Sequence, residues 1–171
     1  MKNGANARRA FWPLVVVWVV TDFVTKRWAE RDLLPAPAVD VLGDWVRLRL
    51  VYNPGAAFGL HLGPYSRWIF LLIAAAAVVG IAWRARQHDW SERLRQIAAA
   101  LVVGGATGNL IDRIRGPLGV VDFIDMGIGA TRWPTFNVAD IGVSCGAVAL
   151  AISFWIEDNR RAREAKHAPA T

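Results

Sequence analysis

The chain has 171 residues, of which 54% are hydrophobic and 20% are charged, and it carries a net charge of +6. This length predicts one domain, and the positive mean hydropathy of +0.29 argues against an ordinary soluble protein. The basic residues stand mainly beside apolar runs, a placement that favours membrane topology over nucleic-acid binding. The single cysteine excludes an intrachain disulfide, and the three histidines lie in no metal-ligand spacing, so we expect no metal site and no cofactor.

Four apolar runs predict four transmembrane helices. Each run takes in neighbouring residues to reach the roughly twenty that are needed to cross a hydrocarbon core of about 30 Å. The second run is the clearest, because tryptophans stand at both of its ends and Arg67 and Arg84 flank it. The predicted spans are residues 11–29, 67–84, 95–115 and 137–157.

The first run follows basic residues at the amino terminus, so a cleavable signal peptide is the alternative to a retained helix. A stretch that resembles a cleavage site, Ala36-Pro37-Ala38, lies far beyond the usual distance from the apolar region and contains a proline. The pattern therefore favours a retained helix within a single membrane-embedded domain of residues 1–171.

The distribution of charge predicts the orientation of the chain. With four spans, the amino terminus, the loop between the second and third spans, and the carboxyl terminus lie on one side of the membrane. The whole net charge of +6 falls on that side, because the basic and acidic residues elsewhere balance. The positive-inside rule then places both termini in the cytoplasm. Residues 30–67 and 116–135 face outward, and residues 160–171 form a solvated cytoplasmic tail.

The outward region between the first two spans contains a strand pattern. From Trp45 to Tyr52, apolar side chains alternate with Arg47 and Arg49, and Asn53-Pro54-Gly55 follows as a turn. We expect a short strand and a turn on the membrane surface.

Two glycines in the third run, Gly104 and Gly108, are four residues apart. This spacing predicts the close approach of another helix rather than phosphate binding, because no P-loop lysine follows.

Polar and ionisable residues gather at the outward ends of the predicted spans, where such groups normally have a partner or a function. They are Asp22, Lys26, Asn109, Asp112, Arg113, Asp122, Asp125, Asn137 and Asp140.

Several of these residues also have a purely structural interpretation. Asp22 and Lys26 are four residues apart and fit an ion pair within a helix. The Asp112-Arg113 pair can cap and anchor a helix end. Asn137 fits the N-cap of the fourth helix, with Asp140 as an acidic partner at the third helical position.

The structural interpretations leave unexplained why several acids converge on one side, without metal ligands and without a serine or cysteine nucleophile in a suitable setting. Hydrolysis by paired aspartates fits this set. In such a pair one carboxylate takes a proton from water while its protonated neighbour polarises the scissile carbonyl, since two close carboxylates do not both ionise cheaply. The composition leaves the pair open among Asp112, Asp122, Asp125 and Asp140.

Five motifs, in chain order, make the pattern specific. They are Asp22 with Lys26; Asn53-Pro54-Gly55-Ala56-Ala57-Phe58; Gly104-Gly105-Ala106 followed by Gly108-Asn109 and Asp112-Arg113; Val121-Asp122-Phe123; and Phe136-Asn137-Val138-Ala139-Asp140. Together they resemble the lipoprotein signal peptidases (signal peptidase II), a family of aspartic peptidases, over nearly the whole chain except its termini. The resemblance implies an all-α membrane protein of four transmembrane helices with a small extracytoplasmic β-cradle and a surface helix.

The resemblance also implies a role for each motif residue. The catalytic pair would be Asp122 and Asp140. The substrate-binding or dyad-supporting residues would be Asn53, Gly55, Asn109, Arg113, Asn137 and Ala139, and the polar residues with a structural role would be Asp22, Lys26 and Asp112.

The implied activity is that of an intramembrane aspartic endopeptidase, which removes the signal peptide from a prolipoprotein by cleaving just before the diacylglyceryl-modified cysteine. The enzyme would be a monomer in the bacterial inner membrane, in contact with membrane lipids and not with nucleic acid, and its active site would lie near the outer face. Two alternatives stay open. One is a small transporter or channel in which Asp22, Lys26 and Asp140 relay ions, and the other is a non-catalytic lipid-binding or assembly subunit.

Overall fold

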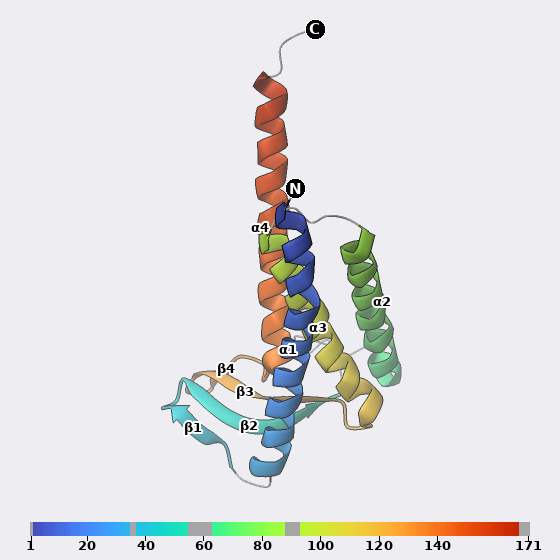
Figure 1. Cartoon of the computed structure of the whole chain (residues 1–171). Coiled ribbons are helices and arrows are strands. Elements are labelled where there is room, and N and C mark those ends of the chain that lie inside the picture. Colours follow the sequence, from blue (N-terminus) through green and yellow to red (C-terminus); the bar gives the residue numbers. More distant parts are fainter. Residues whose placement is uncertain (1, 35–36, 55–62, 88–92, 168–171) are drawn as a thin grey trace.

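The computed structural model describes residues 2–34, 37–54, 63–87 and 93–167, which form four long helices and a small sheet (Figure 1). The helices are α1 (Lys2–Asp32), α2 (Ser66–Gln87), α3 (Arg93–Arg115) and α4 (Val138–His167), and a 3-10 turn, η2 (Gly63–Tyr65), precedes α2. The strands are β1 (Val39–Leu42), β2 (Val46–Asn53), β3 (Val120–Ile128) and β4 (Thr131–Arg132).

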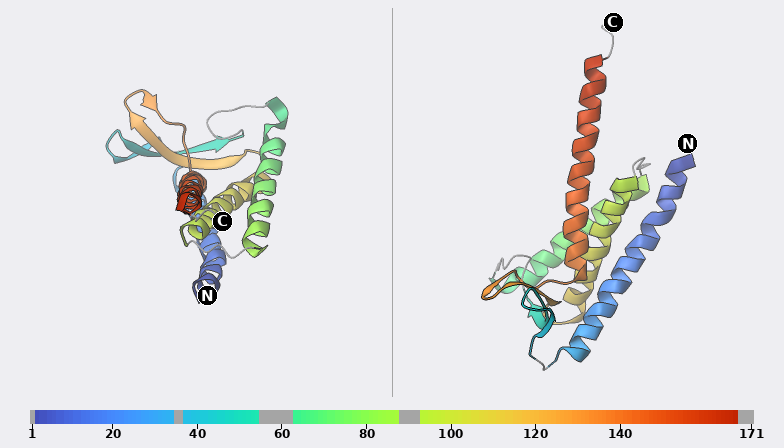
Figure 2. Two further views of the ribbon diagram at one scale, coloured as in Figure 1. Left: turned by 90° about the horizontal axis from the view of Figure 1, so that it is seen from above. Right: turned by 90° about the vertical axis from the view of Figure 1, so that its left-hand side faces the viewer.

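Helix α3 lies at the centre of the bundle and packs against α1, α2 and α4 (Figure 2). Glycines on α3 allow this close approach. An added Cβ at Gly104 would lie 2.9 Å from the Cβ of Trp18 in α1, and one at Gly105 would collide with the carbonyl oxygen of Ala139 in α4. The close helix packing expected at Gly104 is confirmed, and its reason is that backbones meet directly where no side chain intervenes.

An apolar cluster joins the amino-terminal halves of α1 and α3. Its buried members are Phe11 and Val15 of α1 and Ala99, Ala100 and Val103 of α3. In an apolar solvent such contacts stabilise the bundle through dispersion and close packing, because lipid tails compete equally well for apolar surface.

Three helices in the described part of the chain are long and apolar enough to cross a membrane. Their segments are Ser66–Trp83, Arg93–Arg115 and Val138–Glu164, and they correspond to the second, third and fourth predicted spans. Only 6% of the α2 segment is buried inside the protein, as for a helix surrounded by lipid. Helix α1 is as long as these, but Asp22, Lys26 and Arg27 interrupt the apolar run in its sequence.

The strands form one antiparallel sheet in the order β1-β2-β3-β4, which lies at one end of the bundle and extends to one side of it (Figures 1 and 2). The register of β2 against β3 shifts between Leu48 and Val51. Leu48 and Phe123 pack against Ala29 and Leu33 at the end of α1. This apolar contact fixes the sheet to the bundle.

The opposite face of the sheet carries a network of ion pairs. Arg47 and Asp125 face each other across β2 and β3, so their side chains share a face. The Nε of Arg47 lies 2.9 Å from Asp40 Oδ1, and Asp125 binds the Nε of Arg132 at 3.0 Å and the Nε of Arg49 at 3.3 Å. The sheet therefore has an apolar face that is anchored to the helices and a polar face that is cross-linked by arginines.

The expected helical membrane protein with a small sheet is confirmed. The strand predicted from Trp45 to Tyr52 is β2, shifted by one residue at each end. The predicted surface helix has no counterpart in the described ranges beyond the single turn η2, and residues 55–62 before that turn lie outside the described residues.

Helix α4 extends beyond the predicted fourth span. That span was predicted to end near residue 157, with residues 160–171 as a cytoplasmic tail, and α4 continues as a helix to His167. Glu157 binds the Nη2 of Arg160 and the Nε of Arg161, each at 2.9 Å, and such pairs stabilise an exposed helix. The other helices also run past the predicted limits of 11–29, 67–84 and 95–115.

The substitution Gly105→Ala should destabilise the protein. Its Cβ would collide with the Ala139 carbonyl and lie 3.0 Å from the Val143 nitrogen, so α3 and α4 would have to separate. Overpacking of this kind costs about 1–3 kcal/mol. We expect a clearly lower midpoint of thermal unfolding in detergent. Tryptophan fluorescence measures this midpoint.

The matched control is Gly80→Ala on α2, where an added Cβ has nothing within 4 Å. Alanine is the better helix former, so this variant should unfold at the wild-type temperature or above it. Equal losses in the two variants would contradict the packing argument.

Candidate active site

The polar centre of the bundle is the ammonium group of Lys26 in α1, whose side chain is only 1% exposed. Its Nζ lies 2.8 Å from Asp22 Oδ2, 2.8 Å from Asp112 Oδ2 and 2.9 Å from Asn109 Oδ1. An ammonium group has three N–H donors, so each donor has its own acceptor. The ion pair expected within α1 is confirmed, but the same lysine also ties α1 to α3 through Asp112 and Asn109.

Asp22 connects this centre to α4. Its Oδ1 accepts the backbone N–H of Ala139 at 2.8 Å, one of the N–H groups that have no partner within a helix at its first turn. The carboxylate fits between α3 and α4 because Gly108 of α3 has no side chain. An added Cβ at Gly108 would collide with Asp22 Oδ2 and lie 3.3 Å from the Cβ of Ala139. Ala139 is fully buried at this contact, and its place beside substrate stays a prediction.

The first turn of α4 is held by a reciprocal cap. The Oδ1 of Asn137 accepts the N–H of Asp140 at 3.0 Å, and the Oδ2 of Asp140 accepts the N–H of Asn137 at 3.2 Å. The N-cap that the sequence predicted at Asn137 is confirmed. The cap also fixes the direction of both side chains, so that Asn137 reaches β3 and Asp140 reaches Asn109 of α3.

Strand β3 brings Asp122 to the same place. The carbonyl of Phe136 accepts the N–H groups of Phe123 and Ile124 at 3.0 and 2.8 Å, which holds the start of α4 against the strand. Strand β3 in turn lies beside the end of β2 because Gly119, at φ 105°, takes a conformation that other residues rarely adopt. A Cβ at Gly119 would also collide with the backbone oxygen of Asn53.

Asparagine amides hold both aspartates. Asp122 Oδ1 accepts the Nδ2 of Asn137 at 2.7 Å, and Asp122 Oδ2 accepts the Nδ2 of Asn53 at 3.1 Å. Asp140 Oδ1 accepts the Nδ2 of Asn109 at 2.7 Å, in addition to the Asn137 N–H on its other oxygen. Asn137 therefore bonds to both aspartates, and all four carboxylate oxygens accept hydrogen bonds from asparagine residues.

Charge compensation separates these two aspartates from the other buried acids. Asp22 and Asp112 share Lys26, and Asp125 is held by two arginines of the sheet. In the described part of the chain, neither Asp122 nor Asp140 forms an ion pair, and no three His, Cys, Asp or Glu side chains gather as metal ligands would. The four candidates that the sequence left open are thus reduced to one adjacent pair without a counter-ion.

The carboxyl group of Asp122 has an unusual acidity as a result. Burial of its side chain, which is 2% exposed, and the nearby charge of Asp140 together raise its pKa from 3.8 to about 7. A carboxyl group with this pKa carries its proton below neutral pH.

Arg113 supplies positive charge beside the pair without binding either member directly. Its side chain is 9% exposed, it donates from Nη1 to the carbonyl of Asn109 at 3.2 Å, and it is close enough to attract Asp122 and Asp140. The Nε of Arg67 in α2 donates to the Arg113 carbonyl at 2.9 Å, which satisfies a free acceptor at the end of α3. Gly55, the remaining predicted site residue, lies outside the described residues.

A family model described as signal peptidase (SPase) II matches residues 14–156 of the chain. The chain is 43% identical over 163 residues to a lipoprotein signal peptidase of Hydrogenovibrio crunogenus, with 91% of each chain covered. It is 39% identical over 168 residues to a lipoprotein signal peptidase of Burkholderia mallei, with 96% of each covered. The chain belongs to the signal peptidase II family. The expected activity, removal of signal peptides from prolipoproteins, is thereby confirmed.

The fold is also that of solved membrane enzymes. A bacterial membrane enzyme solved by the in meso method at 2.3 Å resolution matches with a TM-score of 0.80 and 25% identity, covering 95% of this chain and 94% of that chain. Another, solved by the same method at 1.9 Å resolution, matches with a TM-score of 0.73 and 27% identity, covering 85% of this chain and 92% of that chain. The signal peptidase II family member described here is therefore a membrane protein.

Some residues that build the site gave no signal in the sequence analysis. Arg67 was treated only as a flanking charge, and Gly119 was not singled out. A glycine just before a strand is a detectable signal for a positive φ, but only the structure shows that it lets β3 approach Asn53. The contact of Asp22 with α4 spans 117 positions of sequence and has no local pattern.

The high pKa of Asp122 should make stability fall as pH rises. Between about pH 4 and pH 7 the folded protein binds a proton at Asp122 that the unfolded chain has already lost. The stabilisation from this group is therefore complete below its unfolded pKa and is lost as pH rises through about 7. Asp122→Asn removes the titration, so the free energy of unfolding should change less between pH 4 and pH 8 than in the wild type.

Chemical unfolding in mixed micelles at a series of pH values measures this slope. One pKa unit corresponds to about 1.4 kcal/mol, so the difference between the two slopes should add up to a few kcal/mol over the range. If the free energy of unfolding changed with pH in the same way in both proteins, Asp122 would have the same pKa in the folded and unfolded states, which would contradict the prediction.

Proposed function

We propose that this signal peptidase II uses Asp122 and Asp140 as its catalytic dyad and cleaves a prolipoprotein just before the diacylglyceryl-modified cysteine. The observation that carries the proposal is the contrast in charge compensation. The buried Asp22, Asp112 and Asp125 each have a lysine or arginine within ion-pair distance, whereas the buried Asp122 and the half-buried Asp140 have only asparagine donors. Acids kept together without a counter-ion are costly, and such a cost is typical of a functional site.

The raised pKa of Asp122 assigns the roles of the two carboxyl groups. Asp122, with a pKa raised to about 7, donates its proton in a hydrogen bond to the scissile carbonyl oxygen. Asp140 then acts as the base and takes a proton from the attacking water. The water oxygen bonds to the carbonyl carbon, the carbonyl oxygen takes the proton of Asp122, and the resulting tetrahedral intermediate has no covalent bond to the enzyme.

Collapse of the intermediate completes the reaction. The carbon–nitrogen bond breaks, the leaving amine of the cysteine takes the proton that Asp140 received, and Asp122 regains its proton from the hydroxyl group of the intermediate. The products are the free carboxyl end of the signal peptide and the free amino group of the lipid-modified cysteine. Neither a metal nor a cofactor takes part in this proposal.

The neighbouring residues support the dyad in this scheme. Asn137 and Asn109 orient the two carboxyl groups, and Asn53 fixes the second oxygen of Asp122. Arg113 lies near both acids and attracts negative charge that develops on the substrate oxygen. We also assign a substrate contact to Gly55, on the motif alone. We also propose that the enzyme acts as a monomer.

The proposed placement in the membrane has four spans, with α1 as the first. Val16, Val20 and Val24 of α1 are more than half exposed and lie on one face, as lipid-facing side chains would. Its charged residues Asp22 and Lys26 face the bundle, where they are 1% exposed and paired. Ionisable residues within spans behave in this way, so they do not prevent α1 from crossing.

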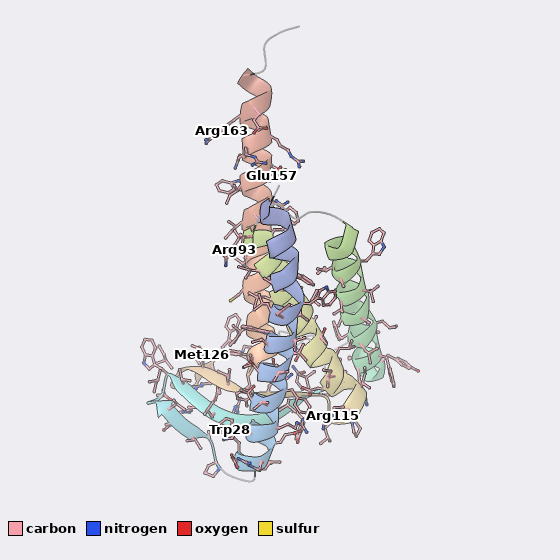
Figure 3. The ribbon with its side chains drawn as sticks, viewed as in Figure 1. Trp28, Arg93, Arg115, Met126, Glu157 and Arg163 are labelled. Carbon is pink, nitrogen blue, oxygen red and sulfur yellow. The ribbon has the colours of Figure 1, made fainter. Side chains whose placement is uncertain are left out.

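The proposed orientation puts both termini in the cytoplasm of a bacterial inner membrane and the sheet at its outer face. Arg93, Glu157 and Arg163 lie at the end of the bundle that is opposite to the sheet (Figure 3). The excess of basic residues at that end supports a cytoplasmic location. The dyad then lies near the outer face, where the signal helix and acyl chains of a substrate are already held in the bilayer, so that mainly local positioning is needed.

The dyad is tested by cleavage of a purified prolipoprotein carrying the diacylglyceryl group, read as a mobility shift on a gel. Asp122→Asn and Asp140→Asn keep the size of each side chain and remove its charge. Each should lower the cleavage rate by at least about a thousand-fold, because both proton transfers fail. Cleavage at the wild-type rate by either folded variant would refute the dyad.

Asp112→Asn and Asp125→Asn serve as matched controls, because both acids are buried and close in sequence to the proposed site. Each should retain cleavage within about ten-fold in protein that is folded by gel filtration, since neither acid takes part in proton transfer. Loss of cleavage in Asp112→Asn with retention in Asp122→Asn would point to the rival pair. Ion flux without cleavage in the wild type would favour the transporter alternative instead.

The four-span topology predicts the behaviour of reporter fusions. Alkaline phosphatase, which is active only outside the cytoplasm, should be active when fused after Asp32 at the end of α1 and inactive after Gln87 at the end of α2. A fluorescent protein fused to the carboxyl terminus should fluoresce in the cytoplasm. Inactive phosphatase after Asp32 would show that α1 does not cross.

A further inference from the structure

A cavity of about 130 Å³ lies between the outer ends of α1 and α3 and the adjoining strands. Its polar lining comes from Arg27, Glu30, Tyr52, Asp112 and Arg115. None of the proposed dyad residues or their asparagine partners lines it, so it is a separate feature from the active site.

Two arginines of this cavity converge on one aromatic ring. The Cζ of Arg27 lies 5.6 Å and the Cζ of Arg115 lies 5.1 Å from the centroid of the Phe23 ring. Both guanidinium groups thus gather around a side chain that is 39% exposed on α1. Figure 3 shows Arg115 at the sheet end of the bundle, next to α1.

The positive charge of this pair is incompletely used. In the described residues Arg115 is exposed and forms no ion pair, and the Nε of Arg27 is buried without a hydrogen-bond acceptor. The Nη1 of Arg27 binds Glu30 Oε2, and the Tyr52 hydroxyl donates to Glu30 Oε1 at 3.3 Å. A guanidinium group without an ion pair, held on the same ring as a second guanidinium group, is suited to binding an anion.

The two acids of the lining do not cancel this preference. Glu30 is paired with Arg27, and Asp112 is paired at 2.8 Å with Lys26, which it shares with Asp22. Arg115 is the one charged side chain of the lining that forms no ion pair within the described residues.

The position of the pair along α1 indicates the kind of anion. Val16, Val20 and Val24 form an exposed apolar stripe that ends one turn before Arg27. On the far side of the cavity, Leu118 is 58% exposed. An apolar stripe that ends at two arginines has the form of an acyl chain followed by a phosphate, at the depth where headgroups lie.

We propose that Arg27 and Arg115 bind the phosphodiester headgroup of an outer-leaflet phospholipid, with an acyl chain lying along the valine stripe of α1. This lipid is distinct from the peptidase substrate, whose diacylglyceryl group contains no phosphate. The inference rests on the proposed passage of α1 through the membrane, but it does not depend on the identity of the catalytic residues.

Native mass spectrometry of the purified protein in a lipid-free detergent tests this site. The ligands are phosphatidylglycerol, diacylglycerol with the same acyl chains, and inorganic phosphate. Phosphatidylglycerol should stay bound to the wild type, and the double variant Arg27→Gln/Arg115→Gln should bind it about ten-fold more weakly, because two charge-assisted contacts are lost. Arg31→Gln, four residues farther along α1 at a side chain that is 77% exposed, should bind it like the wild type.

The three ligands distinguish the sources of affinity. Equal retention of diacylglycerol would overturn the proposal, because the headgroup would then contribute nothing. Inorganic phosphate that displaces phosphatidylglycerol at equal concentration would overturn the lipid and leave a free anion as the ligand. Unchanged phosphatidylglycerol binding in the double variant would overturn the assignment to these arginines.

If the double variant fails to fold, the single variant Arg115→Gln takes its place in the test. Arg115 is exposed and its only described interaction is with the Phe23 ring, so this change leaves the fold intact and should still weaken lipid binding about three-fold. Cleavage measured on the same samples separates the two proposals. Protein that cleaves but releases the lipid refutes this inference alone, and protein that binds the lipid but never cleaves refutes the proposed function alone.

Discussion

The structure depends on one buried ammonium group. Lys26 donates to Asp22, Asp112 and Asn109, so its three N–H groups join α1 to α3. Asp22 extends the network to α4 through the N–H of Ala139. A charge at membrane depth is tolerated only when its partners are complete, which means that the three helices must hold one register for the lysine to be buried at all. The same contacts that satisfy Lys26 therefore set the geometry around Asp140 and Asp122.

This arrangement divides the buried acids into two classes with different consequences. Asp22, Asp112 and Asp125 are bound to cations and contribute to the position of helices and strands. Asp122 is left with amide donors and a pKa of about 7, so its ionised form is a source of instability that the surrounding packing must offset. Proteins commonly retain such a cost where chemistry requires it. The two classes lie close together because Asp112 also accepts the N–H of Val121 at 3.3 Å, one residue before Asp122.

The sequence was sufficient to predict the features that have a local signal. Hydrophobic runs located the helices, alternation located β2, and the spacing of Asn137 and Asp140 predicted the cap of α4. The pair of aspartates could not be chosen from residue spacing, because the choice depends on which acids meet a cation in space. Arg132 binds Asp125 from a neighbouring strand and Lys26 binds Asp112 from another helix. The motif resemblance, not periodicity, named Asp122 and Asp140. The helical conformation of the predicted tail was not foreseen, and the spacing of its charged residues is what stabilises that helix.

The lipid site and the dyad, as proposed, lie on two sides of the same ion network. Asp112 lines the cavity between Arg27 and Arg115, binds Lys26 and holds the backbone of β3 beside Asp122. A phosphate in that cavity would bring negative charge near Asp112. The two arginines would compensate that charge, so that it would not disturb the ion pair between Asp112 and Lys26. The arginine pair would then serve to keep headgroups at this surface without disturbing the register that Lys26 imposes. In this arrangement the depth of α1 in the bilayer, fixed by the point where its valine stripe meets Arg27, also fixes the depth of the peptide bond that the dyad reaches.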